Sequence, residues 1–127
     1  MHYYTDGGSY KKIGIILVTD IDGNILLKKT FQNELTNNEL EYEAIIAGME
    51  LAQNNDVIYN DSKLCVEQIN GDFKIRQNKL IPYSAKAKKI QKEKNLIIIW
   101  IPRDQNPSGK SLERIKRKYK NTQYESY

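Results

Sequence analysis

The spacing of hydrophobic residues along the first third of the chain predicts strands. Residues 2–5, 12–19 and 24–31 are rich in aromatic and β-branched side chains, which favour extended backbone. Segments containing glycine, at 7–9 and 20–23, separate these runs, and we expect a turn at each of them. The pattern therefore predicts three antiparallel strands at the start of the chain.

The rest of the chain alternates between helical and strand periods. Segments with helical periodicity, bounded by typical start or stop residues, are 39–53, 62–70, 82–94 and 107 to about 119. Apolar runs of strand length are 56–59 and 96–101. The second run is uninterrupted, which is typical of a strand buried on both faces of a sheet.

The order of these elements, β-β-β-α-β-α-α-β-α, predicts an α/β fold. We expect a five-stranded mixed sheet, with three antiparallel strands followed by parallel strands, flanked by helices on both faces. No internal repeat or linker divides the chain. Residues 1–120 are therefore expected to form a single domain, followed by a flexible tail at 121–127.

Composition narrows the class of protein. The 127 residues are 39% hydrophobic and 28% charged, and no apolar run reaches the roughly 18 residues of a membrane span. The N-terminus lacks the apolar stretch of a secretory signal, so we expect a cytoplasmic protein. Cys65 is the one cysteine, which excludes an intrachain disulfide and a cysteine-based zinc site and predicts a buried thiol.

The net charge of +4 conceals an uneven distribution. Residues 1–72 carry 5 Lys and Arg against 12 Asp and Glu, residues 73–94 carry 8 against 1, and residues 95–127 carry 7 against 3. An acidic region that can hold divalent cations, beside a basic segment that can neutralise phosphates, is typical of a nucleic-acid enzyme. A lysine-rich helix that only faces solvent is the alternative.

Two aspartates follow predicted strands. Asp6 comes at the carboxyl end of the first strand, and Asp61 follows the strand at 56–59 and precedes a helix. Alone, Asp6 is most simply a turn residue and Asp61 a helix N-cap. If the two strands are neighbours, however, the carboxylates converge at the edge of the sheet where ligands bind in open α/β folds. Convergence of this kind predicts a bound cation.

Glu41 adds a third carboxylate. At about 100° per residue it lies opposite the solvent-facing glutamates of its helix and on the same stripe as Ala44, Ile45 and Gly48, so it points toward the sheet. Burying an unpaired carboxylate costs several kcal/mol, so a partner is expected. A lysine in a buried salt bridge is one alternative. A Mg²⁺ ion shared with Asp6 and Asp61 is the other, because Mg²⁺ prefers oxygen ligands.

Four segments of the chain resemble the motifs of a known family. These segments are YTDGGS (4–9), TNNELEYEAIIAGMELA (36–52), NDSKLCVEQINGDFKI (60–75) and IPRDQN (101–106). In order and spacing they resemble type I ribonuclease H, in its compact branch without a large basic protrusion. The resemblance implies the ribonuclease H-like fold and hydrolysis of the RNA strand of RNA/DNA hybrids. It also implies that Asp6, Glu41 and Asp61 hold Mg²⁺ or Mn²⁺, with two ions when substrate is bound.

The same resemblance implies a substrate surface. Asn37 and Asn38 match positions that contact the minor groove of the hybrid, where the RNA strand displays its 2′-hydroxyls. The other residues expected to bind the hybrid are Gly7, Gly8, Ser9, Ser62, Lys63, Lys74, Arg76, Lys79, Lys86, Lys88, Lys89 and Lys92. We expect a monomer with no small-molecule cofactor and no membrane contact. The one histidine, His2, is expected to be an ordinary strand residue rather than a catalytic group.

The sequence departs from the family at its fourth acid, where Lys110 replaces aspartate. Three outcomes are open. In the first, the three acids suffice to hold the metal, with phosphate and water completing the coordination. In the second, the Lys110 ammonium takes the place of one metal ion as a fixed positive charge on the phosphate. In the third, activity is lost. Glu113 or Asp104 is a candidate to compensate. The histidine often found in the preceding loop is missing, with Arg103 and Asp104 near its place, and Lys63 replaces a common glutamine.

The same residues also suggest other functions. Gly109, Lys110 and Ser111 resemble the end of a phosphate-binding loop, but Asp104 stands where that motif requires glycine. A catalytically silent nucleic-acid-binding module with the same fold is the stronger rival. A related resolvase or integrase-type nuclease is disfavoured by the Thr36–Asn38 motif followed by Glu41.

Overall fold

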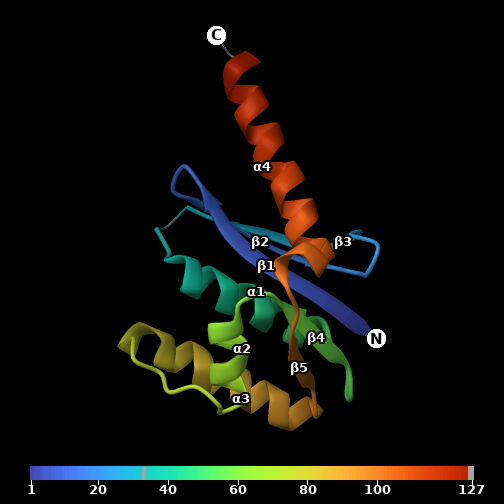
Figure 1. The fold of residues 1–127 in the computed structure, drawn as a ribbon, viewed down its shortest axis with the longest axis vertical. Helices are drawn as coiled ribbons and strands as arrows, with labels where there is room; N and C mark the ends of the chain where they lie inside the picture. The colour runs from blue at the N-terminus through green and yellow to red at the C-terminus, as the bar shows by residue number, and fades with distance from the viewer. Residues whose placement is uncertain (33, 126–127) are drawn as a thin grey trace.

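A five-stranded mixed sheet forms the centre of the protein, in the order β3-β2-β1-β4-β5 (Figure 1). The computed structural model describes residues 1–32 and 34–125, with side chains described up to residue 120. The strands are β1 (His2–Tyr10), β2 (Ile13–Thr19), β3 (Ile25–Phe31), β4 (Val57–Asn60) and β5 (Ile97–Trp100). The first three strands pair antiparallel, whereas β4 pairs parallel with both β1 and β5. The predicted mixed sheet is confirmed.

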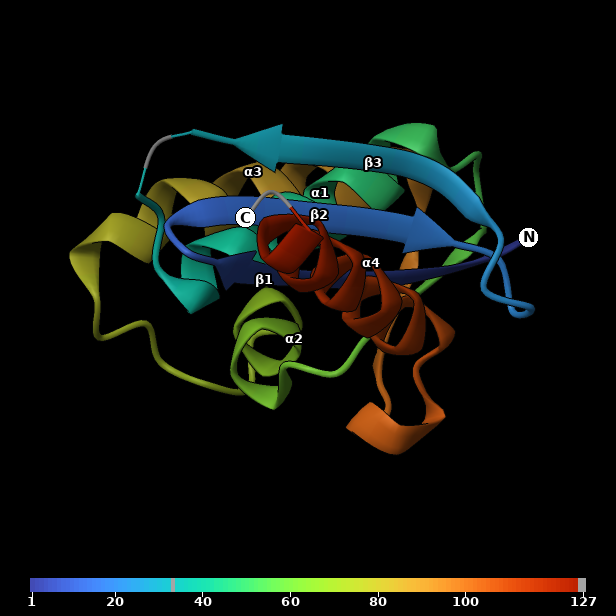
Figure 2. The same cartoon turned by 90° about the horizontal axis from the view of Figure 1, so that it is seen from above.

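Helices cover the sheet on both faces, as the sequence predicted (Figures 1 and 2). Helix α1 (Asn37–Leu51) packs on β1, β2 and β4, with α3 (Ile81–Lys94) against its outer side, and α4 (Pro107–Glu125) packs on β1 and β2 from the other face. Helix α2 (Lys63–Ile69) contacts α3 and β5. Short 3₁₀ turns at Asn78–Leu80 and Arg103–Gln105 precede α3 and α4.

The larger core lies between the sheet and α1, where Tyr42, Ile45, Met49 and Ile58 are fully buried. A smaller one joins β2 to Leu112 of α4. Among the described residues, none of the helices combines the length and the apolar character that crossing a membrane requires.

The turn predicted at residues 7–9 is wrong. Strand β1 continues through both glycines to Tyr10, and the chain turns at Lys11 and Lys12, which have φ values of 46° and 68°. The glycines serve close packing instead. A Cβ on Gly7 would lie 2.4 Å from the Leu40 carbonyl oxygen of α1, and a Cβ on Gly8 would lie 2.7 Å from the Lys116 Nζ of α4.

Two further predictions need correction. Strand β5 is not buried on both faces, because it is the edge strand of the sheet, and Ile97 and Ile99 are exposed. Helix α4 runs to Glu125 rather than ending near Tyr119, so part of the predicted tail is helical, and residues 126–127 lie outside the described part of the chain.

Both ends of α1 are fixed by side chains. Thr36 is the N-cap, and its hydroxyl accepts from the Glu39 N–H while the Glu39 carboxylate accepts from the Thr36 N–H, which is a complete capping box. At the other end Lys94 Nζ donates to the carbonyls of Met49, Glu50 and Ala52. The residue at which α1 begins is therefore fixed, and this determines the direction in which the Glu41 side chain points.

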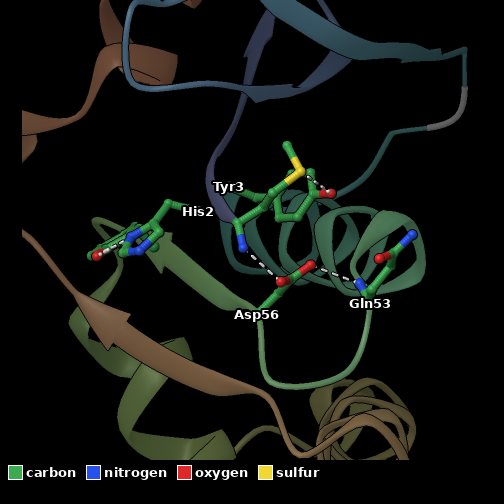
Figure 3. A network of polar contacts seen from close by, with 6 residues as sticks. His2, Tyr3, Gln53 and Asp56 are labelled. Atoms are coloured by element: carbon green, nitrogen blue, oxygen red, sulfur yellow. Dashed lines mark hydrogen bonds and ion pairs between the residues drawn. The ribbon is translucent and has the colours of Figure 1, made fainter.

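A polar network ties β1 to the loop before β4 (Figure 3). The Asp56 carboxylate accepts from the Met1 α-amino group and from the Gln53 backbone N–H, each at 2.7 Å. The ammonium beside it, as a hydrogen-bond donor, lowers the pKa of Asp56. His2 Nδ1 lies 2.8 Å from the Tyr59 hydroxyl across the parallel pair, which agrees with its interpretation as a strand residue.

The two glycines of β1 should differ sharply in their tolerance of a side chain. Gly7→Ala is expected to lower the free energy of unfolding by about 2 to 3 kcal/mol, because backbone atoms of α1 must move to admit the methyl group. Gly8→Ala should cost less than about 1 kcal/mol, since the flexible end of Lys116 can move aside. Urea unfolding of both variants measures the difference. Equal losses would contradict the close approach of α1 to Gly7.

Candidate metal centre

Three carboxylates converge where β1, the start of α1 and the end of β4 meet. One oxygen each from Asp6, Glu41 and Asp61 lies within 4.8 Å of the others, and no other such group of three or more possible metal ligands occurs among the described residues. Asp6 and Glu41 are each 7% exposed, and Asp61 is half-buried. The sequence predicted this convergence from the two strand ends and the helix stripe.

The strand pairing explains how the two aspartates meet. The parallel ladder between β1 and β4 ends at Thr5 opposite Asn60, so Asp6 and Asp61 are the next residues of the two chains. Asp61 is not a helix cap, because the Ser62 hydroxyl accepts from the Cys65 N–H and is the N-cap of α2. Its carboxylate is therefore free to point toward Asp6.

Glu41 reaches the site because α1 begins directly over β1. The Gly7 N–H donates to Glu41 Oε1 at 2.9 Å, from the same glycine whose missing Cβ allows the close approach. None of the ion pairs between described residues involves Glu41, so the alternative of a buried lysine partner is not supported.

Two buried asparagines hold the carboxylates, and the sequence interpretation assigned no role to either. Asn60 Nδ2 donates to the Thr5 carbonyl and hydroxyl and to Glu41 Oε1, at 3.1 to 3.3 Å. Asn106 Nδ2 donates to the Thr5 carbonyl at 3.0 Å and to Asp61 Oδ2 at 2.8 Å. Asn106 Oδ1 also accepts from the Ser108 N–H at the start of α4. The Asn106 amide therefore joins α4 to the metal centre.

The electrostatics of the three acids favour a cation. Burial, and then repulsion from Asp61, raises the pKa of Asp6, and nearby Arg103 opposes that rise. Burial, and then repulsion from Asp6 and Asp61, raises the pKa of Glu41, against the hydrogen bonds from Gly7 and Asn60. Without a cation the site retains protons, and a divalent ion would displace them.

The shape of the site also suits a metal ion. A cleft of about 960 Å³ contains Asp6 and Glu41 in its lining, together with Gly109 of α4. A Cβ on Gly109 would lie 3.4 Å from Asp6 Oδ2 and 3.6 Å from Asp61 Oδ2, so a side chain there would enter the space between the carboxylates. An all-oxygen donor set of this kind fits Mg²⁺ or Mn²⁺ and leaves positions for water and phosphate.

Some of the predicted substrate residues line this cleft and others do not. Those that line it, beside the acids, are Gly7, Gly8, Ser9, Asn37 and Lys110. The Asn38 carbonyl accepts from the Cys65 thiol, and Lys63 Nζ lies 5.7 Å from the centroid of the Trp100 ring. Trp100 Nε1 in turn donates to the Asp61 carbonyl at 3.1 Å, which makes it a second contact to Asp61 that sequence reasoning missed.

All the cations of the basic segment, residues 73–94, that were expected to bind the hybrid are exposed. These residues are Lys74, Arg76, Lys79, Lys86, Lys88, Lys89 and Lys92. Lys86 pairs with Glu50 of α1 at 3.4 Å and lines a separate groove between α1, α3 and β3. The stretch from 71 to 80 runs on the side of the molecule where α1 begins (Figures 1 and 2).

The rival phosphate-binding loop is not present. Residues 103–105 form a 3₁₀ turn, and Gly109, Lys110 and Ser111 belong to the first turns of α4. The buried Ser111 hydroxyl donates to the Gly23 carbonyl and is engaged in packing α4 on the β2–β3 turn.

The sheet order, the helices on both faces and the acidic triad at the end of the β1–β4 ladder define the ribonuclease H-like class. Residues 4–112 match the profile of a family described as reverse transcriptase-like. The chain belongs to this family, and within the class it resembles type I ribonuclease H.

Solved structures of known proteins agree with this assignment. The LC11 ribonuclease H1, in complex with an RNA/DNA hybrid, is 32% identical with a TM-score of 0.65 over 83% of this chain and 87% of that one. The N-terminal ribonuclease H domain of Rv2228c from Mycobacterium tuberculosis is 26% identical with a TM-score of 0.65, over 83% and 88% of the two chains. Ribonuclease H1 of the archaeon Halobacterium salinarum NRC-1 shares the fold at 24% identity, with a TM-score of 0.70 over 87% and 92%.

Among curated proteins, the bifunctional protein Rv2228c of Mycobacterium tuberculosis is 28% identical over 112 residues. The match covers 80% of this chain but 31% of that protein. The chain thus spans about a third of the length of the curated relatives it matches.

The raised pKa values predict how the metal-free protein responds to pH. An acid whose pKa is raised by folding stabilises the fold below its unfolded value, and that contribution is lost as the pH rises through the folded value. The free energy of unfolding in EDTA should therefore fall from pH 5 to pH 8, as Asp6 and Glu41 ionise.

Asp6→Asn removes one of the repelling charges and should stabilise the metal-free protein at pH 8 by on the order of 1 kcal/mol. Asp22→Asn, in the exposed β2–β3 turn, is the control for losing a carboxylate elsewhere. Urea unfolding in EDTA at both pH values measures these changes. A destabilised Asp6→Asn protein at pH 8 would contradict the repulsion among the three acids.

Proposed function

We propose that the protein is an endonuclease that hydrolyses the RNA strand of RNA/DNA hybrids, with a divalent metal ion held by Asp6, Glu41 and Asp61. The observation that carries the proposal is the convergence of the three carboxylates within 4.8 Å, beside the open space at Gly109. The 32% identity with LC11 ribonuclease H1, whose structure contains an RNA/DNA hybrid, supports the choice of substrate.

The reaction needs no protein nucleophile. Water adds to the phosphorus of the scissile phosphate, the bond from phosphorus to the 3′-oxygen breaks, and the 3′-oxygen takes up a proton. A divalent ion supplies Lewis acidity and lowers the pKa of bound water. The protein's own contribution is to fix the ligands, since Gly7 and Asn60 orient Glu41 while Asn106 orients Asp61.

Substrate binding is assigned to the cleft and the surface beside it. Asn37 lines the cleft at the N-terminus of α1 and would donate to the 2′-hydroxyls or base edges of the minor groove. The exposed cations of the basic segment would hold the phosphates of the hybrid. The proposed enzyme is a monomer that acts in the cytoplasm as a single domain over 1–120 and uses Mg²⁺ or Mn²⁺. That two ions are held when substrate is bound is implied by the family resemblance alone.

A catalytically silent hybrid-binding module is the second candidate. It is favoured by one observation, which is that an exposed lysine, Lys110, lines the cleft next to the triad. Binding without turnover would distinguish this module from the enzyme.

The enzyme reading predicts metal-dependent cleavage of a labelled RNA/DNA hybrid in Mg²⁺ or Mn²⁺. Asp6→Asn should reduce the rate by at least about 100-fold, because it removes a ligand of the ion and several kcal/mol of stabilisation. Asp22→Asn is the matched control and should retain the wild-type rate. Gel analysis of the products measures cleavage, and activity that survives Asp6→Asn would overturn the proposed site.

Hybrid binding should weaken steeply with salt, because each phosphate contact releases bound cations. Replacing Arg76 and Lys79 with alanine should make the slope of log affinity against log salt shallower by about 2 if both contact phosphates. Lys28 and Lys29 of β3, replaced together, are the control for a loss of two charges. Fluorescence anisotropy in EDTA measures binding without cleavage. An unchanged slope in the Arg76 and Lys79 variant would show that these cations only face solvent.

A further inference from the structure

The cleft lined by Asp6 and Glu41 is also lined by three cations. Arg103 of the 3₁₀ turn and Lys110 and Lys116 of α4 share its lining with Asp6 and Glu41. Lys110 is exposed, Lys116 reaches across Gly8, and neither takes part in an ion pair within the described part of the chain. Because no carboxylate pairs with these two ammonium groups among the described residues, they are available to an anionic ligand.

The first turn of α4 fixes the position of Lys110. Asn106 caps this turn, with its side chain on Asp61 and on the Ser108 N–H, and the Lys110 N–H donates to the Asn106 carbonyl at 3.3 Å. The preceding residue, Gly109, faces Asp6 Oδ2 and Asp61 Oδ2. Residue 110 therefore lies one helical turn after Asn106, and its side chain lines the same cleft as Asp6.

The described residues offer ligands for one ion rather than two. Asp104 and Glu113 also line the cleft, but neither belongs to the group of carboxylates whose oxygens lie within 4.8 Å. Glu113 is exposed and pairs with Arg117 at 3.8 Å. Asp61 Oδ2 also accepts a hydrogen bond from the Asn106 amide. A second divalent ion would gain no further carboxylate and would be repelled by the cations around the cleft.

We propose that this centre takes one divalent ion, and that the Lys110 ammonium provides the second positive charge by donating a hydrogen bond to a non-bridging oxygen of the scissile phosphate. The inference rests on the proposed function, because it requires that the phosphate of a hybrid enters this cleft. A protonated lysine has no free electron pair, so it stabilises charge on the phosphate and does not act on the attacking water.

Manganese stoichiometry tests this proposal separately from activity. Mn²⁺ is titrated into the protein in complex with a hybrid whose RNA strand carries 2′-fluoro groups, and bound Mn²⁺ is counted by electron paramagnetic resonance. The wild type should bind one ion per chain. Lys110→Asp should bind two, because it adds a carboxylate next to Asp6 and Asp61. Lys29→Asp on β3, with the same change of charge, should still bind one.

Cleavage of an ordinary hybrid gives a second measurement that does not depend on the aspartate variant folding. Lys110→Gln should keep one bound Mn²⁺ but lose at least about 10-fold in kcat, whereas Lys110→Arg should recover most of the loss because it restores the charge. Two ions in the wild type, or one ion in a folded Lys110→Asp protein, would overturn the role of Lys110. A wild type that binds no ion would instead overturn the proposed function itself.

Discussion

The close packing of α1 on the backbone of β1 determines the geometry of the whole site. At Gly7 the two elements approach so closely that only hydrogen fits, and the same residue donates its N–H to Glu41. The capping box at Thr36 fixes where the helix begins, and it is therefore Glu41 that meets the strand. Without this contact the glutamate would lie above the sheet and could not reach the two aspartates. The packing of α1 on β1 and the placement of Glu41 at the metal centre therefore depend on the same contact.

Three carboxylates held together repel one another, and the fold offsets part of this repulsion with hydrogen bonds from neutral amide groups. Asn60 and Asn106 both bind Thr5, and each also donates to one of the acids. Amide groups orient the carboxylates without neutralising them, so the negative charge remains available to a cation. The two lysines of the cleft, Lys110 and Lys116, lie on its α4 side instead. The site thus separates a region for a metal from a region for phosphate.

The sequence predicted the element order, the mixed sheet and the convergence of the triad, because all three follow from local periodicity and from parallel strands ending together. It failed where an outcome depends on neighbouring layers. The sequence predicted a turn at Gly7 and Gly8, because their function, which is to let helices pack closely on the strand, depends on tertiary contacts. The apolar run of β5 read as fully buried, but the edge position leaves Ile97 and Ile99 exposed. Asn106 has the local pattern of a helix cap, and its bond to Asp61 depends on tertiary contacts.

The Asn106 side chain bonds to Thr5 across a sequence separation of 101 residues, and the Ser108 hydroxyl bonds to the Tyr4 carbonyl across 104. All three acids are synthesised long before either residue. During translation the emerging chain therefore carries the complete set of ligands without the amide that orients one of them. Domains form as units once their long-range contacts can close. A ribosome-bound chain that stops short of α4 should remain unable to assemble the metal centre, so the centre matures only after α4 has emerged.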